Sequence, residues 1–179
     1  MTAKPSRSAR SLRPARAPAP PMPALESLDR DHLEVLRVLK ALEALLAHVD
    51  ENGADEIARA NAREVIAFFA GPAREHHAAE ERLVFPSLLS SGDADLVQQV
   101  RRLQQDHGWL EEDWIELSTH IEAIANGYSW YDMNMLRLAL PIFTALYHEH
   151  IALEESMIYP EARRREALAR QVQAARTQG

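Results

Sequence analysis

The chain has 179 residues, long enough for one domain with a substantial hydrophobic core. It contains no cysteine, which excludes disulfides, thiol catalysis and cysteine-ligated zinc or iron–sulfur sites. No apolar run approaches the roughly 18 residues of a membrane span. The formal net charge is −7, but the first 24 residues carry +5, which leaves −12 for the rest of the chain. Such an acidic body argues against nucleic acid as the main partner.

Residues 1–24 form the first distinct segment. They hold six of the ten prolines, five basic residues and no acid, and no apolar period is visible. This composition predicts a disordered basic tail, which offers a contact for a protein partner. The segment lacks the apolar core of a secretory signal peptide. Its composition resembles that of an organellar transit peptide, but the prolines would break the amphipathic helix of such a peptide. We expect the protein in the cytoplasm, in a bacterium.

Four later segments predict amphipathic helices, because apolar residues recur along them at intervals of three and four. These segments run from Leu25 to Val49, from Ile57 to Leu83, from Leu96 to Ile124 and from Leu136 to Met157. Gly71-Pro72 is expected to kink the second helix, and Asp93 to cap the third. Short connections favour an all-α fold, an antiparallel up-down four-helix bundle over residues 25–162. An Arg-rich helical or frayed tail is expected over 163–179.

One motif occurs twice in the predicted bundle. Residues 76–86 and 150–160 both read His-x-Ala-x-Glu-Glu-x-x-aliphatic-aromatic-Pro. On a helix, a histidine and a glutamate four residues apart lie on one face, one turn apart. Such a pair can bind a metal in the way that helical His-x-x-x-His pairs do. Two copies in one small chain therefore indicate a metal site built from two helices.

The predicted turns also give the depth of each histidine in the bundle. In an up-down hairpin, residues equidistant from the turn lie at the same level. One histidine on each predicted helix belongs to this comparison: His32, His76, His107 and His150. The midpoint in sequence between each consecutive pair of them falls in or next to a predicted turn. We therefore expect these four side chains at one level, one on each helix and all pointing inward. Glu80 and Glu154 follow roughly 6 Å further along two parallel helices, at about 1.5 Å per residue.

These six residues predict a cage of four imidazoles and two carboxylates. Carboxylates are rarely buried unless they are paired or bound to a metal. Six protein ligands would saturate one metal, whereas two metals that share the carboxylates keep positions open for water or a small ligand. Mixed nitrogen and oxygen ligands suit iron, with manganese and zinc as alternatives. The competing interpretation is four ordinary core histidines and two glutamates at helix ends.

Residues 25–160 resemble the hemerythrin-like family with the HHE cation-binding domain. The resemblance rests on four motifs: Asp31-His32, His76-x-x-x-Glu80 before Phe85-Pro86, Asp106-His107, and His150-x-x-x-Glu154 before Tyr159-Pro160. It implies a non-haem site of two iron ions, bridged by carboxylates and an oxo or hydroxo group, that binds O2 or a related small ligand. Carried over by position, the implied ligands are His32, His76, Glu80, His107, His150 and Glu154.

The chain departs from the oxygen carriers of that family in the third helix. The carriers place a second histidine one turn after the first, and here that position is Glu111. An additional carboxylate would favour the ferric state, which argues against reversible O2 carriage. The resemblance then favours a protein that senses or handles O2, NO, peroxide or iron. The alternative is a di-iron oxidoreductase or an iron-donating repair protein in oxidative or nitrosative stress, so whether the chain is an enzyme stays open.

Other polar residues near the motifs receive less weight. His77 lies about 100° around the helix from His76 and is kept as an alternative ligand. Glu81 and Glu155 are expected to face solvent or pair with arginines. Tyr147, one turn before His150, is either a core tyrosine or a hydrogen-bond donor to a bound ligand.

Overall fold

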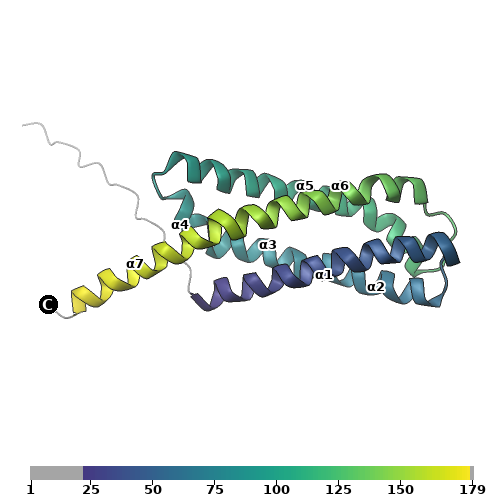
Figure 1. Ribbon diagram of the computed structural model, residues 1–179, viewed down its shortest axis with the longest axis horizontal. Coiled ribbons are helices and arrows are strands. Elements are labelled where there is room, and N and C mark those ends of the chain that lie inside the picture. The colour runs from purple at the N-terminus through teal and green to yellow at the C-terminus, as the bar shows by residue number, and fades with distance from the viewer. Residues whose placement is uncertain (1–21, 178–179) are drawn as a thin grey trace, which may run out of the picture.

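The computed structural model describes residues 22–177, and these residues are almost entirely helical, with no strand among them. The elements in chain order are α1 (Met22–Asn52), α2 (Glu56–Ala70), α3 (Pro72–Leu83), α4 (Phe85–Leu89), α5 (Ala94–Ala125), α6 (Met133–Leu153), the π-helix η1 (Glu154–Ile158) and α7 (Tyr159–Thr177). Along α2, α3 and α4 the chain follows one path, and α6, η1 and α7 likewise form one continuous helical run (Figure 1).

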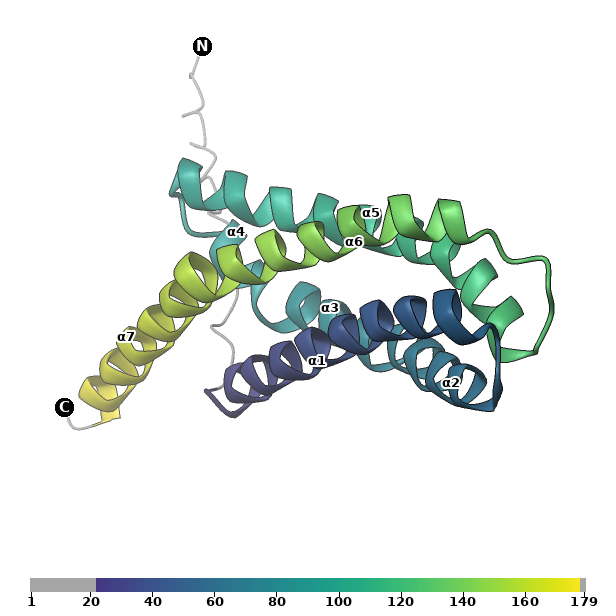
Figure 2. The ribbon, with the colours of Figure 1, turned by 45° about the vertical axis from the view of Figure 1, so that its right-hand side comes forward.

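The helices form an antiparallel four-helix bundle, which confirms the predicted fold class. Contacts join α1 to α2, α2 to α5, α5 to α6 and α6 back to α1, so the four helical runs close around a common core. The turns use the predicted residues: Gly53 adopts φ 72° after α1, and the side chain of Asp93 caps α5 by accepting from two backbone amides. α7 continues beyond the bundle and leaves it at one end (Figure 2).

Two of the helical runs are interrupted at related places. Gly71 and Pro72 separate α2 from α3, at the predicted break. Further on, each copy of the repeated motif loses regular α-helix just after its glutamate. In the first copy α3 ends at Leu83 and α4 begins with Pro86 in its first turn, and in the second copy a π-helix covers Glu154–Ile158. The proline at the end of each motif explains both, because it lacks the N–H that a continuing α-helix needs.

A polar layer divides the hydrophobic core into two clusters. The larger cluster lies between α1, α2, α5 and α6 and includes Leu42, Phe69, Trp114 and Phe143. The smaller one lies at the other end of the bundle, where Leu25, Phe85, Leu103 and Tyr159 pack together. The six predicted ligands occur where each helical run passes from one cluster to the other. The layer is therefore shielded from water along the bundle axis in both directions.

Some expectations concern the ends of the chain. The tail predicted for residues 1–24 lies almost wholly outside the described range, although its last three residues already belong to α1. At the other end, α7 extends to Thr177. In residues 22–177 no helix is long and apolar enough to cross a membrane.

Candidate metal centre

The six predicted ligands meet in one buried layer. α1 supplies His32, α3 supplies His76 and Glu80, α5 supplies His107, and the α6–η1 run supplies His150 and Glu154. Their exposed fractions range from 0% for His32, Glu80 and Glu154 to 9% for His107. The turn midpoints thus predicted correctly that residues far apart in the sequence would gather at one level.

The two glutamates lie between the histidines and are shared by them. His32 Nε2 lies 3.1 Å from Glu154 Oε2, and His150 Nε2 lies 3.1 Å from Glu154 Oε1. On the other side, Glu80 Oε2 lies 3.6 Å from His76 Nε2 and 3.3 Å from His107 Nε2. Each carboxylate therefore contacts one imidazole from each half of the chain.

This sharing creates two places where an ion fits. The first metal position lies among His32, His76, Glu80 and Glu154, and the second lies among Glu80, His107, His150 and Glu154. Within each group, one ligand atom from every residue lies within 4.8 Å of the others. Two ions placed there would share both carboxylates, which is the arrangement of carboxylate-bridged metal pairs in helix bundles.

Several buried polar atoms of the cage lack a hydrogen bond to any of the residues that the structure describes. They are Glu80 Oε2, both carboxylate oxygens of Glu154, His107 Nε2 and His150 Nε2. A buried polar atom without a partner costs on the order of 1–3 kcal/mol, and more when it is charged. All five atoms face the two metal positions, and bound cations would satisfy them. The residues present therefore fit a metal pair.

The outer nitrogen of every cage histidine faces another carboxylate. His32 Nδ1 lies 3.0 Å from Glu155 and His107 Nδ1 lies 3.2 Å from Glu81. His76 Nδ1 lies 3.6 Å from Asp31, and His150 Nδ1 lies 3.7 Å from Asp106. We call these four residues the outer carboxylates: Asp31, Glu81, Asp106 and Glu155.

The outer carboxylates set the orientation and tautomer of the imidazoles. A carboxylate at Nδ1 keeps the proton there and leaves the Nε2 lone pair directed into the cage, as in metal sites generally. Glu81 and Glu155 are 38% and 52% exposed, so they face solvent as expected, but each also contacts a cage histidine. Glu81 additionally accepts a hydrogen bond from Gln104. Spacing within one helix does not reveal a contact with a histidine on a neighbouring helix.

Burial strongly affects the protonation of the cage. Burial, followed by the negative charge of Glu80, raises the pKa of Glu154 well above its ordinary value. The metal-free pair of glutamates therefore favours a proton between them. A bound cation would take the place of that proton, since carboxylate ligands bind metal in the ionised form.

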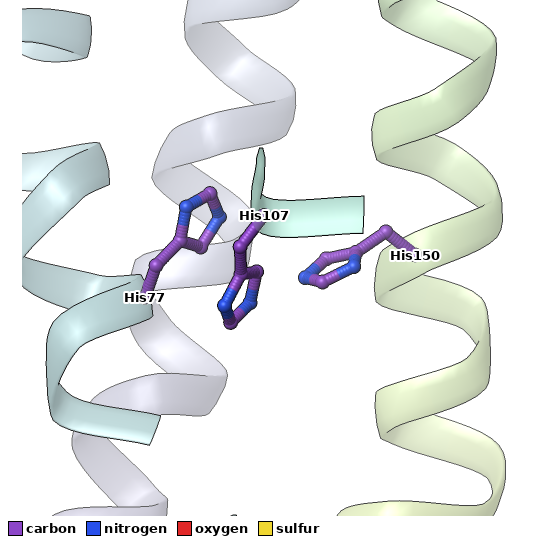
Figure 3. Close-up of side chains that lie close together, drawn as sticks. All are labelled: His77, His107 and His150. Atoms are coloured by element: carbon purple, nitrogen blue, oxygen red, sulfur yellow. The ribbon is translucent and has the colours of Figure 1, made fainter. Parts of the chain in front are cut away.

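A further histidine, His77, lies beside the second metal position. Its ring is 4.1 Å from that of His107 and 5.5 Å from that of His150, and the three come from α3, α5 and α6 (Figure 3). The three residues form a candidate metal group of their own. Burial, followed by the neighbouring His107, lowers the pKa of His77 well below its ordinary value, so the ring is neutral. The rings of His77 and His107 are nearly parallel, at 14°, so one must turn before both can bind the same ion.

Two aromatic side chains cover the cage at matching places in the repeat. Tyr159 stacks on His32 at 5.2 Å, and Phe85 stacks on His107 at 5.7 Å. Tyr159 additionally donates a hydrogen bond of 2.5 Å to Glu80 Oε1. Tyr159 directly follows the π-helix, and its amide bonds to the Glu154 carbonyl five residues earlier. The sequence showed the aromatic position of the repeat but not the contact of Tyr159 with Glu80.

Glu111 is directed away from the metal positions. Both of its carboxylate oxygens accept hydrogen bonds from Arg74 of α3, one of them at 2.8 Å. Its side chain is 39% exposed, and it belongs to none of the candidate metal groups among the described residues. Its position one turn after His107 suggested a further metal ligand, but the Glu111 carboxylate instead pairs with an arginine on α3.

The remaining histidines and Tyr147 lie outside the cage. His48 contacts Asp55 and His120 accepts from the Asp132 amide, so both serve turns at the far end of the bundle. His148 is exposed. Tyr147 is buried among Phe69 and Phe143, and its ring stacks near that of His77 with 6.0 Å between the centroids.

The composition of the cage and a comparison with known families agree. Imidazole and carboxylate donors together suit first-row transition metals such as iron, manganese and zinc. No curated protein matches the chain. The sequence profile described as "Hemerythrin HHE cation binding domain" matches residues 24–162, which span all six cage residues and the outer carboxylates. The chain belongs to the hemerythrin family of HHE cation-binding domains.

Proposed function

We propose that the protein holds two non-haem iron ions and binds or senses a small ligand, O2, NO or peroxide, at this pair. His32 and His76 would hold the first ion, His107 and His150 would hold the second, and Glu80 and Glu154 would be shared by both. The observation that carries the proposal is the pair of four-residue groups that share both buried glutamates. Iron would supply a redox-active Lewis acid that takes up the small ligand.

The protein's own residues have distinct parts in this function. Glu155 and Glu81 bind Nδ1 of His32 and of His107 and so keep the Nε2 lone pairs of these two rings directed into the cage, while Asp31 and Asp106 face the Nδ1 atoms of the other two rings. The two apolar clusters exclude bulk water from both ends of the layer. Four neutral imidazoles contribute no charge, whereas the six carboxylates in and around the cage contribute up to six negative charges. This excess favours the more highly charged ferric state, so the proposal is a sensor or reactive site rather than a reversible O2 carrier.

The second candidate is a di-iron oxidoreductase or an iron-donating repair protein. The same negative charge favours it, because ferric iron is formed when ferrous iron reduces O2 or peroxide. The two candidates differ in how the reduced protein behaves once it has met O2 or NO. A persistent ligand-dependent absorption band supports binding or sensing, whereas repeated consumption of peroxide or transfer of iron to an acceptor supports the second candidate.

Metal analysis tests the site itself. Protein purified from iron-replete cells is expected to carry about two iron ions per chain, as the two groups of ligands imply. His76→Ala and His150→Ala should each lower this content. His148→Ala is the matched control, because His148 is exposed and lies two residues from His150. A metal-free wild-type product, or equal iron in all variants, contradicts the proposal.

A further inference from the structure

A cleft opens beside the first metal position, between α1 and the junction of α2 with α3. Its volume is about 420 Å³. It exists where Gly71 and Pro72 interrupt the helix that packs on α1. The cage ligand His76 lies at its inner end, and Asp31, Glu34 and Glu75 line it. We call this space the α1–α3 cleft.

The charge of the cleft is one-sided. Three acidic residues line it and none of the lining residues is basic. Glu34 is bound by Arg37, which lies one turn further along α1. Asp31 and Glu75 therefore provide the uncompensated negative charge. A concave surface lined by one sign of charge concentrates ions of the opposite sign.

The inner end of the cleft contains a buried nitrogen without a partner. His76 is 5% exposed, and its Nδ1 atom makes no hydrogen bond among the described residues. This atom faces Asp31 Oδ2 at 3.6 Å. Its other nitrogen, Nε2, lies 3.6 Å from the shared carboxylate of Glu80. Donor atoms thus continue from the open cleft, through Asp31 and His76, to the centre of the cage.

The corresponding place on the other half of the bundle is closed. There Asp106 takes the part of Asp31 and faces His150 Nδ1. Asp106, however, is 1% exposed, and Arg102 approaches it to 3.8 Å while also contacting Glu149. The positive charge of Arg102 opposes the approach of a cation to the buried Asp106, whereas the half-exposed Asp31 in an acidic cleft attracts one. The two related outer carboxylates therefore differ in access.

We propose that the α1–α3 cleft is the route by which a divalent transition-metal cation reaches the cage, with Glu75 and Asp31 drawing it in and His76 receiving it. This inference rests on the proposed function, since it needs a cage that binds metal. By this route Glu75 affects the rate at which the protein takes up metal but not the final amount of metal bound in the cage. Uncharged ligands such as NO gain nothing from the acidic lining.

Stopped-flow mixing of metal-free protein with Co2+ tests the route, with the visible bands of bound cobalt as the signal. Glu75→Lys changes the charge of the cleft by two units without touching a ligand of the cage. We expect uptake to slow by about 100-fold at low ionic strength, from Coulomb's law in water for a divalent ion passing about 6 Å from a residue whose charge changes by two units, and the effect to shrink as salt is added. The final amount of bound cobalt should equal that of the wild type.

Two further variants make the test specific. Glu64→Lys is the matched control, since Glu64 is exposed on α2, eleven residues earlier and roughly 16 Å away by helical rise. Ser27→Trp narrows the cleft without a change of charge and should also slow uptake. Unchanged uptake in Glu75→Lys, or equal slowing in Glu64→Lys, overturns the route. A wild-type protein that binds no cobalt or iron at all overturns the proposed function instead, so the two failures are distinguishable.

Discussion

The two halves of the cage, one from each copy of the repeated motif and its partner helix, share most of their residue types but differ at two positions. Each half supplies two histidines, one glutamate, two outer carboxylates and one stacked aromatic ring. The aromatic ring is Tyr159 with a hydroxyl in one half and Phe85 without one in the other. Position two of the motif is His77 in the first copy and Ile151 in the second. The shared parts are those that hold two cations, and the differing parts are those that can make the two cations unequal.

The largest effect is expected from the parts that both metal positions share. Glu80→Gln and Glu154→Gln should each reduce bound iron from about two ions per chain to less than one, because each glutamate belongs to both groups. Metal analysis measures this outcome. A variant that keeps both ions shows that the carboxylate does not bridge.

Next come the outer carboxylates, which test the symmetry directly. Glu155→Gln and Glu81→Gln each remove a carboxylate from the Nδ1 atom of a cage histidine. Each should weaken metal binding by about 10–100-fold, the usual cost of losing such a partner. Competition with a chelator of known affinity measures the loss. If the halves are equivalent in this respect, the two variants give similar losses, and an affinity unchanged in both argues against orientation by these residues.

A smaller effect is expected from the hydroxyl that only one half has. Tyr159→Phe removes the hydrogen bond to Glu80 Oε1 and should lower the free energy of unfolding of the metal-free protein by about 1.5–3 kcal/mol, as for a hydrogen bond to a charged group. Tyr147→Phe is the control, because Tyr147 is also a core tyrosine but packs among Phe69 and Phe143 outside the cage. Equal losses in both variants contradict a special role for Tyr159.

The smallest effect is expected at His77. His77→Ile gives the first motif the residue of the second copy and removes the third imidazole beside the second metal position. Two ions should still bind, but the two binding steps should become more alike in affinity. Isothermal titration with Co2+ resolves the steps. Steps that remain as far apart as in the wild type show that His77 packs against His107 without influence on the metal.

The sequence predicted the positions of the cage well because they depend on regular geometry. Helical period and turn midpoints determine which residues face inward and at what depth, and both held for all four histidines. The predictions were incomplete where a side chain contacts a residue of a different helix. Glu81 and Glu155 reach cage histidines, and Glu111 is bound by Arg74. These contacts depend on which helices are neighbours and on how far each side chain reaches. Neither can be inferred from the spacing of residues within a single helix.

The interruptions of the helices show the same limit. The prolines at the ends of both motifs predicted a disturbance, but not that one copy would break into a short helix and the other would widen into a π-helix. The difference coincides with a chemical one, since Tyr159, directly after the π-helix, donates a hydrogen bond to Glu80. A local backbone choice of this kind is decided by packing around the cage, which a single sequence does not display.

The polar layer between the two apolar clusters has a consequence for how the molecule unfolds. The smaller cluster joins the start of α1, α4, the first turns of α5 and the start of α7, and the cage separates it from the larger one. Cations bound in the layer would link the two clusters so that they unfold cooperatively. Loss of the cations would allow the smaller cluster to unfold locally, without the larger one. Amide exchange in α4 and early α7 would then report the occupancy of the cage. A change at the metals would thereby reach the end of the bundle from which α7 projects.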